Sequence, residues 1–450
     1  MLQRSGRWLA LCALALATLA RAVDGASPAF HDGFGIHVET AETLDARQLA
    51  VRVSTAALQH PVDVRILVPD DYDAHPKKRY PVLYLFHGTS GRASDWVLFG
   101  HAVETTAGQP LIVVMPDAGF DGDGGGWFTD WYNGGAGGQP MWETYHVAQL
   151  IPWIDDNLRT IAARRGRAIA GLSQGGFGSL SYAARHPELF TSAAAFSGGC
   201  VIDGDPEAIS VSTAIIQYTT TVLDGVADPD AMFGPRATEE LNWQAHDPGT
   251  LVENVRGMQI ALWTGDGTPG PLDPAPVPPG AAEIEQITFG ATMRFDRDLT
   301  EAGIKHIYNN YGGGTHTFAY WARDLSEYVP VLMRRLRHPG KDPSVVSYRA
   351  AADRWEQWGW RVELARPEPA FTVLERARRT GFMLTGTGTA QVTTPAVYHA
   401  GARLRVVLKS DSGSVPIKAI ADHDGRTRID VPLSDGSEPV TVRVAIRPIS

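Results

Sequence analysis

The stretch that decides the fold reads Gly171-Leu172-Ser173-Gln174-Gly175 and stands between a short apolar strand at 168–170 and a helical pattern at 175–185. A serine on a tight turn from a strand into a helix is typical of a nucleophile elbow, whose flanking glycines leave room for a strained backbone. Chance would place this five-residue pattern about 0.2 to 0.3 times in such a chain, so the motif alone is weak. Its position makes Ser173 the candidate nucleophile. The alternative is a glycine-rich turn with an inert serine.

Strands and helices alternate on both sides of this turn. Two continuously apolar runs, at 82–86 and 111–115, are short and soon followed by Gly or Pro, as in strands buried on both faces. Further strands are expected at 168–170, 193–196, 260–263 and 306–309, helices at 142–158, 175–185, 282–301 and 319–336, and amphipathic edge strands at 49–53 and 62–67. This alternation predicts an α/β three-layer sandwich with a mostly parallel central sheet.

The character of the chain changes after Arg337. The segment 338–343 is rich in Pro and Gly, and strand-like patterns such as 404–408 and 440–446 follow it with few helical ones. We therefore predict an α/β domain at 30–338 and a small all-β domain at 345–450. Trp355, Trp358 and Trp360 open the second domain, either as a platform for sugar rings or packed against the first domain.

The first residues predict export. Arg4 and Arg7 precede an apolar run at 9–20, and Ala20-Arg21-Ala22 offers small residues where a signal peptidase reads them. The alternative is a membrane anchor, but the run is shorter than the roughly 20 apolar residues that cross a bilayer. We expect residues 1–22 to be a signal peptide, the mature protein to be secreted, and no segment to span a membrane. Only Cys200 then remains, which excludes an internal disulfide.

Charge and spacing exclude several classes of function. The 450 residues carry 40 Lys and Arg against 50 Asp and Glu, a net charge of −10 with no basic stripe, so nucleic acid is not expected as a partner. No histidine pair has the spacing of helical metal ligands, and no glycine-rich loop is followed by Lys-Ser or Lys-Thr. Asp117, Asp121 and Asp123 resemble a calcium loop only faintly, because no closing glutamate follows. We expect neither a metal nor a cofactor.

A serine nucleophile that attacks an acyl group needs backbone N–H groups aimed at the developing oxyanion. One comes from the residue after the serine and one from a loop that follows an earlier buried strand. The strand at 82–86 is followed by His87-Gly88-Thr89-Ser90-Gly91. We assign the two donors to the backbone amides of Thr89 and Gln174.

The base should be a histidine on a loop after the last strand, because the chain order in this architecture is serine, acid, histidine. His316 fits best, since it follows Gly312-Gly313-Gly314-Thr315 just after the strand at 306–309. The alternative is an ordinary surface histidine. The acidic candidates between serine and histidine are Asp266, Asp273, Glu283 and Glu285, and position alone does not choose among them.

From about residue 33 to 337 the chain resembles α/β-hydrolases of the esterase D and antigen 85 mycolyltransferase type. The resemblance rests on the segments 80–88, 129–132, 142–144, 171–173, 265–269 and 314–321. The glutamate of the mycolyltransferase branch opens a helix that runs to a Phe-Arg-Asp-like segment, and Glu285 with Phe295-Asp296 align with that stretch. The resemblance therefore implies Glu285 as the acid.

The chain also departs from the mycolyltransferases. Where they carry an Asp-Gly-Leu-Arg loop that helps to hold trehalose, this chain has His87-Gly88-Thr89-Ser90, and Phe318 stands where they have tryptophan. We take Ser90, Thr317 and Phe318 as the candidate substrate-binding residues.

These observations predict a secreted serine carboxylic-ester hydrolase that works through an acyl-enzyme on a small-molecule or lipid ester. The first alternative is an acyltransferase that moves the acyl group onto a sugar or another alcohol. The second is a non-catalytic cell-wall or matrix binding protein on the same fold.

Overall fold

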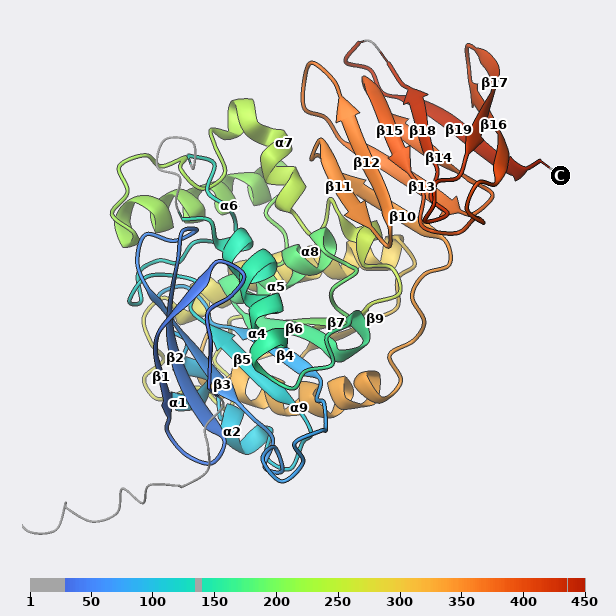
Figure 1. Cartoon of the computed structure of the whole chain (residues 1–450). Helices are drawn as coiled ribbons and strands as arrows, with labels where there is room; N and C mark the ends of the chain where they lie inside the picture. The colour runs from blue at the N-terminus through green and yellow to red at the C-terminus, as the bar shows by residue number, and fades with distance from the viewer. Residues whose placement is uncertain (1–28, 134–139, 435, 450) are drawn as a thin grey trace, which may run out of the picture.

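The computed structural model describes residues 29–133, 140–434 and 436–449 (Figure 1). The predicted signal peptide, residues 1–22, lies outside these described residues. Within them, no helix combines the length and the apolar character that a membrane span requires.

A nine-stranded sheet forms the centre of the first region. The strands in spatial order are β1 (Ile36–Thr43), β2 (Gln48–Thr55), β3 (Val62–Leu67), β5 (Ile112–Pro116), β4 (Val82–Phe86), β6 (Arg167–Leu172), β7 (Ser192–Phe196), β8 (Gln259–Thr264) and β9 (His306–Asn310). All pairs from β5 to β9 are parallel, whereas β1, β2, β3 and β5 pair antiparallel. The predicted mostly parallel sheet is confirmed. The edge strand β1 was not predicted, because only Ile36 in it is buried and its sequence lacks an apolar alternation.

Helices cover both faces of this sheet (Figure 1). One face packs on α5 (Gln174–Arg185), η1 (Thr144–Leu150), α4 (Ile151–Asn157) and α8 (Ala281–Glu301), and the other on α1 (Asp95–Leu98), α2 (Ala102–Thr105) and α9 (Phe318–Arg337). In β4, Tyr84 and Phe86 enter the first core while Leu83 and Leu85 enter the second. Successive side chains of a strand point to opposite faces, so a continuously apolar strand serves two cores. The three-layer sandwich is therefore confirmed.

The predicted helices 175–185, 282–301 and 319–336 are found within about a residue of their expected ends. The predicted helix 142–158 is a π-helical turn, η1, that continues into α4. Seven helical segments of the described first region were not predicted: α1, α2, η2 (Arg164–Gly166), α6 (Pro206–Tyr218), η3 (Thr219–Leu223), α7 (Arg236–His246) and η4 (Val252–Val255). In α6 only Ala208 and Ile216 are buried, so no apolar stripe marks a core-facing side.

The C-terminal region is a separate antiparallel all-β structure, as predicted (Figure 1, orange to red). Its six-stranded sheet contains, in order, β10 (Val346–Ala350), β13 (Thr372–Arg378), β14 (Gly381–Gly386), β19 (Val440–Pro448), β16 (Arg403–Ser410) and β17 (Gly413–Ile420). Its four-stranded sheet contains β11 (Arg354–Gln357), β12 (Trp360–Ala365), β15 (Thr389–Thr393) and β18 (Arg428–Pro432). Apolar side chains of both sheets share one core. Trp355 and Trp360 are buried in this core and form no open platform. Gln357 in the same segment contacts the first region, since its Nε2 donates to the carbonyl oxygen of Arg185 at 3.4 Å.

Side chains of the C-terminal region contact the far end of the helix that begins after Ser173. The hydroxyl of Tyr348 donates to the carbonyl oxygen of Arg185 at 2.7 Å. The Asn254 side chain donates to the carbonyl of Arg349 and accepts from its N–H, both at 2.9 Å. The last carbonyl groups of a helix have no partner within it, so Tyr348 supplies α5 with an external donor.

A buried histidine lies beneath α5 and is held in the neutral state. Nε2–H of His146 donates to the carbonyl of Asp117 at 2.9 Å, and Nδ1 accepts from the Tyr182 hydroxyl at 3.1 Å. Burial lowers the pKa of His146 to about 3. An unfolded chain takes up the proton near pH 6.5, so between these values only the unfolded state carries it. The free energy of unfolding should therefore decrease as the pH falls from about 6.5 towards 3.

The His146→Gln variant should weaken this pH dependence. Glutamine can still donate to Asp117 and accept from Tyr182, but it does not titrate. We expect the slope of unfolding free energy against pH to shrink by as much as about 1.4 kcal/mol per pH unit. Urea unfolding at pH 6.5, 5.5 and 4.5 measures it, and equal slopes in the variant and the wild type would contradict the assignment.

Candidate active site

Ser173 occupies the turn between β6 and α5 in a strained backbone conformation. Its φ of 53° and ψ of −122° lie outside the regions that a non-glycine residue ordinarily adopts. A Cβ on Gly171 would lie 2.3 Å from the carbonyl oxygen of Gly175, and one on Gly175 would lie 2.2 Å from that of His87. The two glycines of the motif are therefore required for space, and the turn presents the serine at the carboxyl end of β6.

His316 reaches the serine from the loop between β9 and α9. Its Nε2 lies 2.9 Å from Oγ of Ser173. The ring packs edge to face on Trp321 at a centroid distance of 4.8 Å, and only 9% of the side chain is exposed. Packing thus fixes the imidazole in a position from which it can accept the serine proton.

Glu285 holds the other side of the imidazole from the second turn of α8. Its Oε2 lies 2.7 Å from Nδ1 of His316, and the side chain is fully buried. Oε1 accepts from the N–H of Gly265 and the hydroxyl of Ser197, both at 2.8 Å. Thr264 and Thr288 donate from 3.2 and 3.4 Å. These donors compensate the burial of a carboxylate, which would otherwise be costly.

The other three acidic candidates take different partners. Asp266 accepts from the N–H and the hydroxyl of Thr268 in its own loop, and the bond from that hydroxyl lowers the pKa of Asp266. Asp273 accepts from Tyr320 and from Thr315, and Glu283 is exposed in the first turn of α8. Among the four, Glu285 alone contacts His316.

The loop after β4 is held in place by a buried neutral histidine. The N–H of Ala118 donates to Nε2 of His87 at 2.9 Å, so the ring proton is on Nδ1, which donates to the carbonyl of Gly88 at 2.8 Å. Burial lowers the pKa of His87, which favours this neutral form. The sequence interpretation used His87 only as part of a motif.

The side chain of Gln174 links the loop after β4 to the serine turn. Its Nε2 donates to the hydroxyl of Thr89 at 3.2 Å and to the carbonyl of Gly124 at 3.0 Å. Within the part of the chain that the structure describes, the backbone N–H groups of Thr89 and Gln174 donate to no protein acceptor. The sequence interpretation included the amide of Gln174 and missed its side chain, whose partners lie 50 and 85 residues away.

A pocket of about 660 Å³ opens over Ser173 and His316. Its wall is largely apolar and includes Trp127, Ile215, Leu223 and Trp321. Of the three candidate substrate-binding residues, Ser90 and Phe318 line this pocket. Thr317 does not line it, and its buried hydroxyl has no hydrogen-bond partner in the structure.

The three aspartates of the possible calcium loop point to separate partners. Asp117 accepts from the N–H groups of Asp63 and Ala93, Asp123 accepts from that of Gly125, and Asp121 faces Arg92. They are not arranged as the ligands of one ion.

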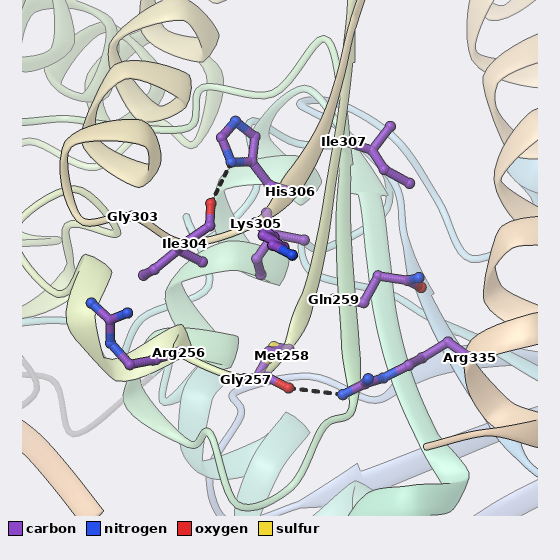
Figure 2. Close-up of a pocket in the computed structure, with 11 residues that line it drawn as sticks. Arg256, Gly257, Met258, Gln259, Gly303, Ile304, Lys305, His306, Ile307 and Arg335 are labelled. Atoms are coloured by element: carbon purple, nitrogen blue, oxygen red, sulfur yellow. Dashed lines mark hydrogen bonds between the residues drawn. The ribbon is translucent and has the colours of Figure 1, made fainter. Parts of the chain in front are cut away.

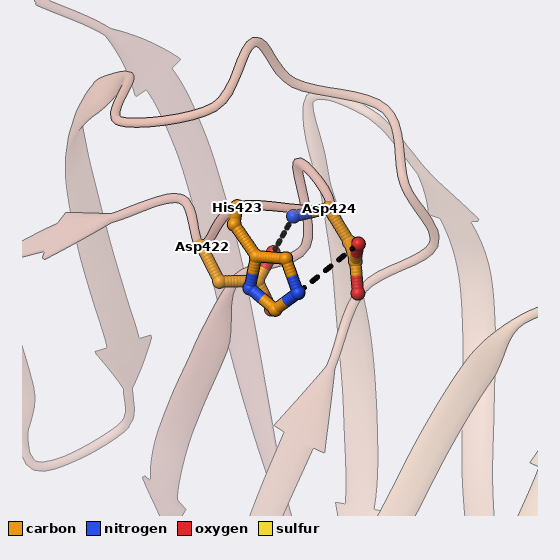
Figure 3. Close-up of side chains that lie close together, drawn as sticks. All are labelled: Asp422, His423 and Asp424. Atoms are coloured by element: carbon orange, nitrogen blue, oxygen red, sulfur yellow. Dashed lines mark hydrogen bonds and ion pairs between the residues drawn. The ribbon is translucent and has the colours of Figure 1, made fainter.

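A cavity and a side-chain cluster lie elsewhere in the described part of the chain. A cavity of about 450 Å³ lies where β8 and β9 begin, at the sheet edge opposite Ser173, with Arg335 and His306 in its wall (Figure 2). Both side chains are already bonded, Arg335 to the carbonyl of Gly257 and His306 to that of Ile304. Asp422, His423 and Asp424 cluster in an exposed turn between β17 and β18, where Asp422 accepts from the N–H of Asp424 (Figure 3). Neither feature contains a serine, a histidine and an acid joined by hydrogen bonds, as the site around Ser173 does.

Residues 55–332 match a family model described as "Putative esterase", which covers more than half of the chain. The chain belongs to this family. It is 33% identical to the esterase Rv1288 of Mycobacterium tuberculosis over 291 residues, 64% of this chain and 59% of that protein. It is 29% identical to the diacylglycerol acyltransferase/mycolyltransferase Ag85B of Mycolicibacterium smegmatis over 268 residues, 56% of this chain and 77% of that one. The chain thus spans only part of the first relative's length.

Two solved structures share the fold. MPT51 (FbpC1) of Mycobacterium tuberculosis superimposes with a TM-score of 0.50 and 24% identity over 66% of this chain and 99% of its own. An S-formylglutathione hydrolase of Agrobacterium tumefaciens does so with a TM-score of 0.50 and 17% identity over the same shares. At these identities the likeness concerns the fold alone. It confirms the α/β-hydrolase fold that the sequence predicted.

Proposed function

We propose that this protein is a secreted serine carboxylic-ester hydrolase that works through an acyl-enzyme. The observation that carries the proposal is the continuous line of hydrogen bonds from Ser173 through His316 to Glu285, at 2.9 and 2.7 Å, beside a largely apolar pocket. Membership of the esterase family supports the same class of reaction. Export rests on the N-terminal sequence pattern alone.

In the proposed reaction, Oγ of Ser173 attacks the ester carbonyl while Nε2 of His316 takes its proton. Glu285 accepts from Nδ1–H and stabilises the imidazolium that forms. The negative charge that develops on the former carbonyl oxygen is held by the free amides of Thr89 and Gln174. His316 then protonates the leaving alcohol, the C–O bond breaks, and an acyl-serine remains. Water, deprotonated by His316, releases the acid and restores the serine.

Hydrolysis is favoured over transfer to a sugar. The loop at 87–90 lacks the Asp-Gly-Leu-Arg sequence with which the mycolyltransferases help to hold trehalose, and Ser90 lines the pocket there instead. The proposed substrate is a small-molecule or lipid ester, with Ser90 and Phe318 of the pocket wall near the reacting group. Transfer of the acyl group to a sugar or another alcohol is the alternative, and the relative named a diacylglycerol acyltransferase/mycolyltransferase supports transfer to an alcohol as a class.

Covalent labelling tests the proposed nucleophile. A fluorophosphonate should modify the wild type once, at Ser173, and mass spectrometry of the digested protein locates the label. The Ser173→Ala variant should stay unlabelled, whereas Ser326→Ala, on the exposed face of α9, should label like the wild type. A wild type without label would favour the non-catalytic binding protein, and a label elsewhere would remove Ser173 from its proposed role.

A substrate panel tests the acceptor. p-Nitrophenyl esters of short to long acyl chains are offered with and without a disaccharide. We expect free acid as the product in both cases. Formation of the sugar ester at the expense of the acid would assign the protein to the acyltransferases.

The hydrogen bond between the side chains of Gln174 and Thr89 should help to position the two backbone N–H groups that bind the oxyanion. Gln174→Met keeps the side chain's length but loses this bond and the one to Gly124, so the loop with the Thr89 amide is less well fixed. We expect kcat to fall about tenfold with little change in KM, less than the loss of a whole donor costs. Thr89→Val removes only the hydroxyl and should act in the same direction.

The double variant tests whether the two residues act together. If they act through their mutual bond, Gln174→Met should cost less in the Thr89→Val background than in the wild type. Fully additive losses, or a change confined to KM, would contradict a positioning role.

A further inference from the structure

Exposed apolar side chains line the pocket above Ser173 or adjoin the residues that line it. Three of them, Tyr218, Ile284 and Ile287, line the pocket and are nevertheless 40 to 55% exposed. Phe99 is 54% exposed and packs on the pocket residue Phe318 with ring centroids 5.4 Å apart. Leu98 and Val222, 64 and 59% exposed, are the chain neighbours of Phe99 and of the pocket residue Leu223. We call these side chains the apolar rim: Leu98, Phe99, Tyr218, Val222, Ile284 and Ile287.

The rim is made by three segments that are far apart in the sequence. Leu98 ends α1 and Phe99 follows it. Tyr218 and Val222 belong to α6 and η3, and Ile284 and Ile287 lie in the first turns of α8. A large exposed apolar patch marks a site of interaction with a protein, a ligand or a membrane. Its continuity with the pocket indicates that whatever covers it also delivers the ester.

The charged residues in and beside the apolar rim indicate which kind of surface it can bind. Residues 208–223 contain no charged side chain, and no Lys or Arg occurs in 93–100 or 281–293. The flanking cations are paired, Arg92 with Asp121 and Arg294 with Asp205. Binding to an anionic bilayer depends on clusters of Lys and Arg near the surface, which these segments lack. The acids Asp95 and Glu283 lie in these segments and oppose an anionic surface as well, so an uncharged surface fits the rim better than an anionic one.

We propose that the apolar rim docks on the surface of an aggregated, uncharged acyl ester, such as an acylglycerol emulsion. An ester in that surface can then enter the pocket without crossing water. This inference rests on the proposed esterase function and adds the physical state of the substrate to it. The favourable term is the burial of exposed apolar area, about 25 cal/mol per Å².

The test introduces charge at two rim positions that neither line the pocket nor take part in catalysis. The double variant Leu98→Glu/Val222→Glu is compared with Val415→Glu/Ile420→Glu, which changes the net charge equally at side chains 58 and 67% exposed in β17. Adsorption to a trioctanoylglycerol emulsion is measured by flotation, with all proteins carrying Ser173→Ala so that no substrate is consumed. Hydrolysis of the emulsion and of soluble p-nitrophenyl acetate is measured with Ser173 intact.

We expect the rim variant to adsorb about tenfold less than the wild type and the β17 variant to adsorb normally, because a charge resists transfer out of water. Hydrolysis of the emulsion should fall in parallel, while turnover of p-nitrophenyl acetate stays within about twofold. The proposal is overturned if the wild type does not adsorb, if both variants adsorb equally, or if the wild type binds only vesicles of phosphatidylglycerol. If the wild type does not hydrolyse p-nitrophenyl acetate, the esterase function is refuted. The adsorption measurement would still show whether the rim binds the emulsion.

Discussion

Replacing Ser173 by alanine should lower kcat for p-nitrophenyl acetate by about 10⁶, the loss that removal of such a serine causes in other serine hydrolases. The expected size follows from the contacts, because Oγ of Ser173 lies 2.9 Å from Nε2 of His316, the base that can take its proton. Alanine keeps the backbone N–H and carbonyl that build the elbow, so the variant should fold like the wild type.

Initial rates with both proteins at matched concentration measure the effect. A thermal midpoint close to that of the wild type shows that the variant is folded. A folded Ser173→Ala protein that retains most of the rate would remove Ser173 from the proposed mechanism.

Exchanging Glu285 for glutamine should lower kcat by about 10⁴, as the loss of the corresponding acid does in serine proteases. The amide cannot accept the Nδ1 proton with the strength of a carboxylate, and its NH₂ group would meet the donors of Gly265 or Ser197, both 2.8 Å from the present oxygen. The imidazole would then lose the support for its charged form.

Asp266→Asn is the matched control for this variant. Its side chain bonds to Thr268 in its own loop, so the exchange should leave kcat near the wild-type value. The same rate assay applies to both proteins. Normal activity of Glu285→Gln together with an inactive Asp266→Asn would show that the acid had been assigned wrongly.

The parts of the fold that were predictable are those whose sequence carries its own signal. β4 and β5 are continuously apolar because both of their faces are buried, and such runs stand out in any sequence. β1 and α6 were missed since few of their side chains are fully buried. Elements of this kind are specified by their neighbours rather than by a pattern of their own.

The candidate site likewise contains residues that the sequence indicated and residues that only the structure brings together. The strand-to-helix turn and the late glycine-rich loop indicated Ser173 and His316, which lie in hydrogen-bond contact in the structure. The choice of Glu285 over Asp266 needed a resemblance, because both residues precede the histidine and only the packing of α8 brings one of them to it. Two of the hydrogen-bond donors to Glu285 belong to Ser197 and Gly265, which are 88 and 20 residues away in the sequence. No local sequence pattern predicts these contacts.

The Tyr348 hydroxyl that donates to the carbonyl of Arg185 spans 163 positions of the chain. The last turn of α5, the helix that begins after Ser173, therefore receives a hydrogen-bond donor from the last quarter of the polypeptide. A gene truncated after α9 would encode an α5 whose final turn lacks this donor, together with an uncovered Asn254. The β-structure is therefore a poor candidate for a detachable fusion module, and screens for shorter, more easily crystallised versions should keep it.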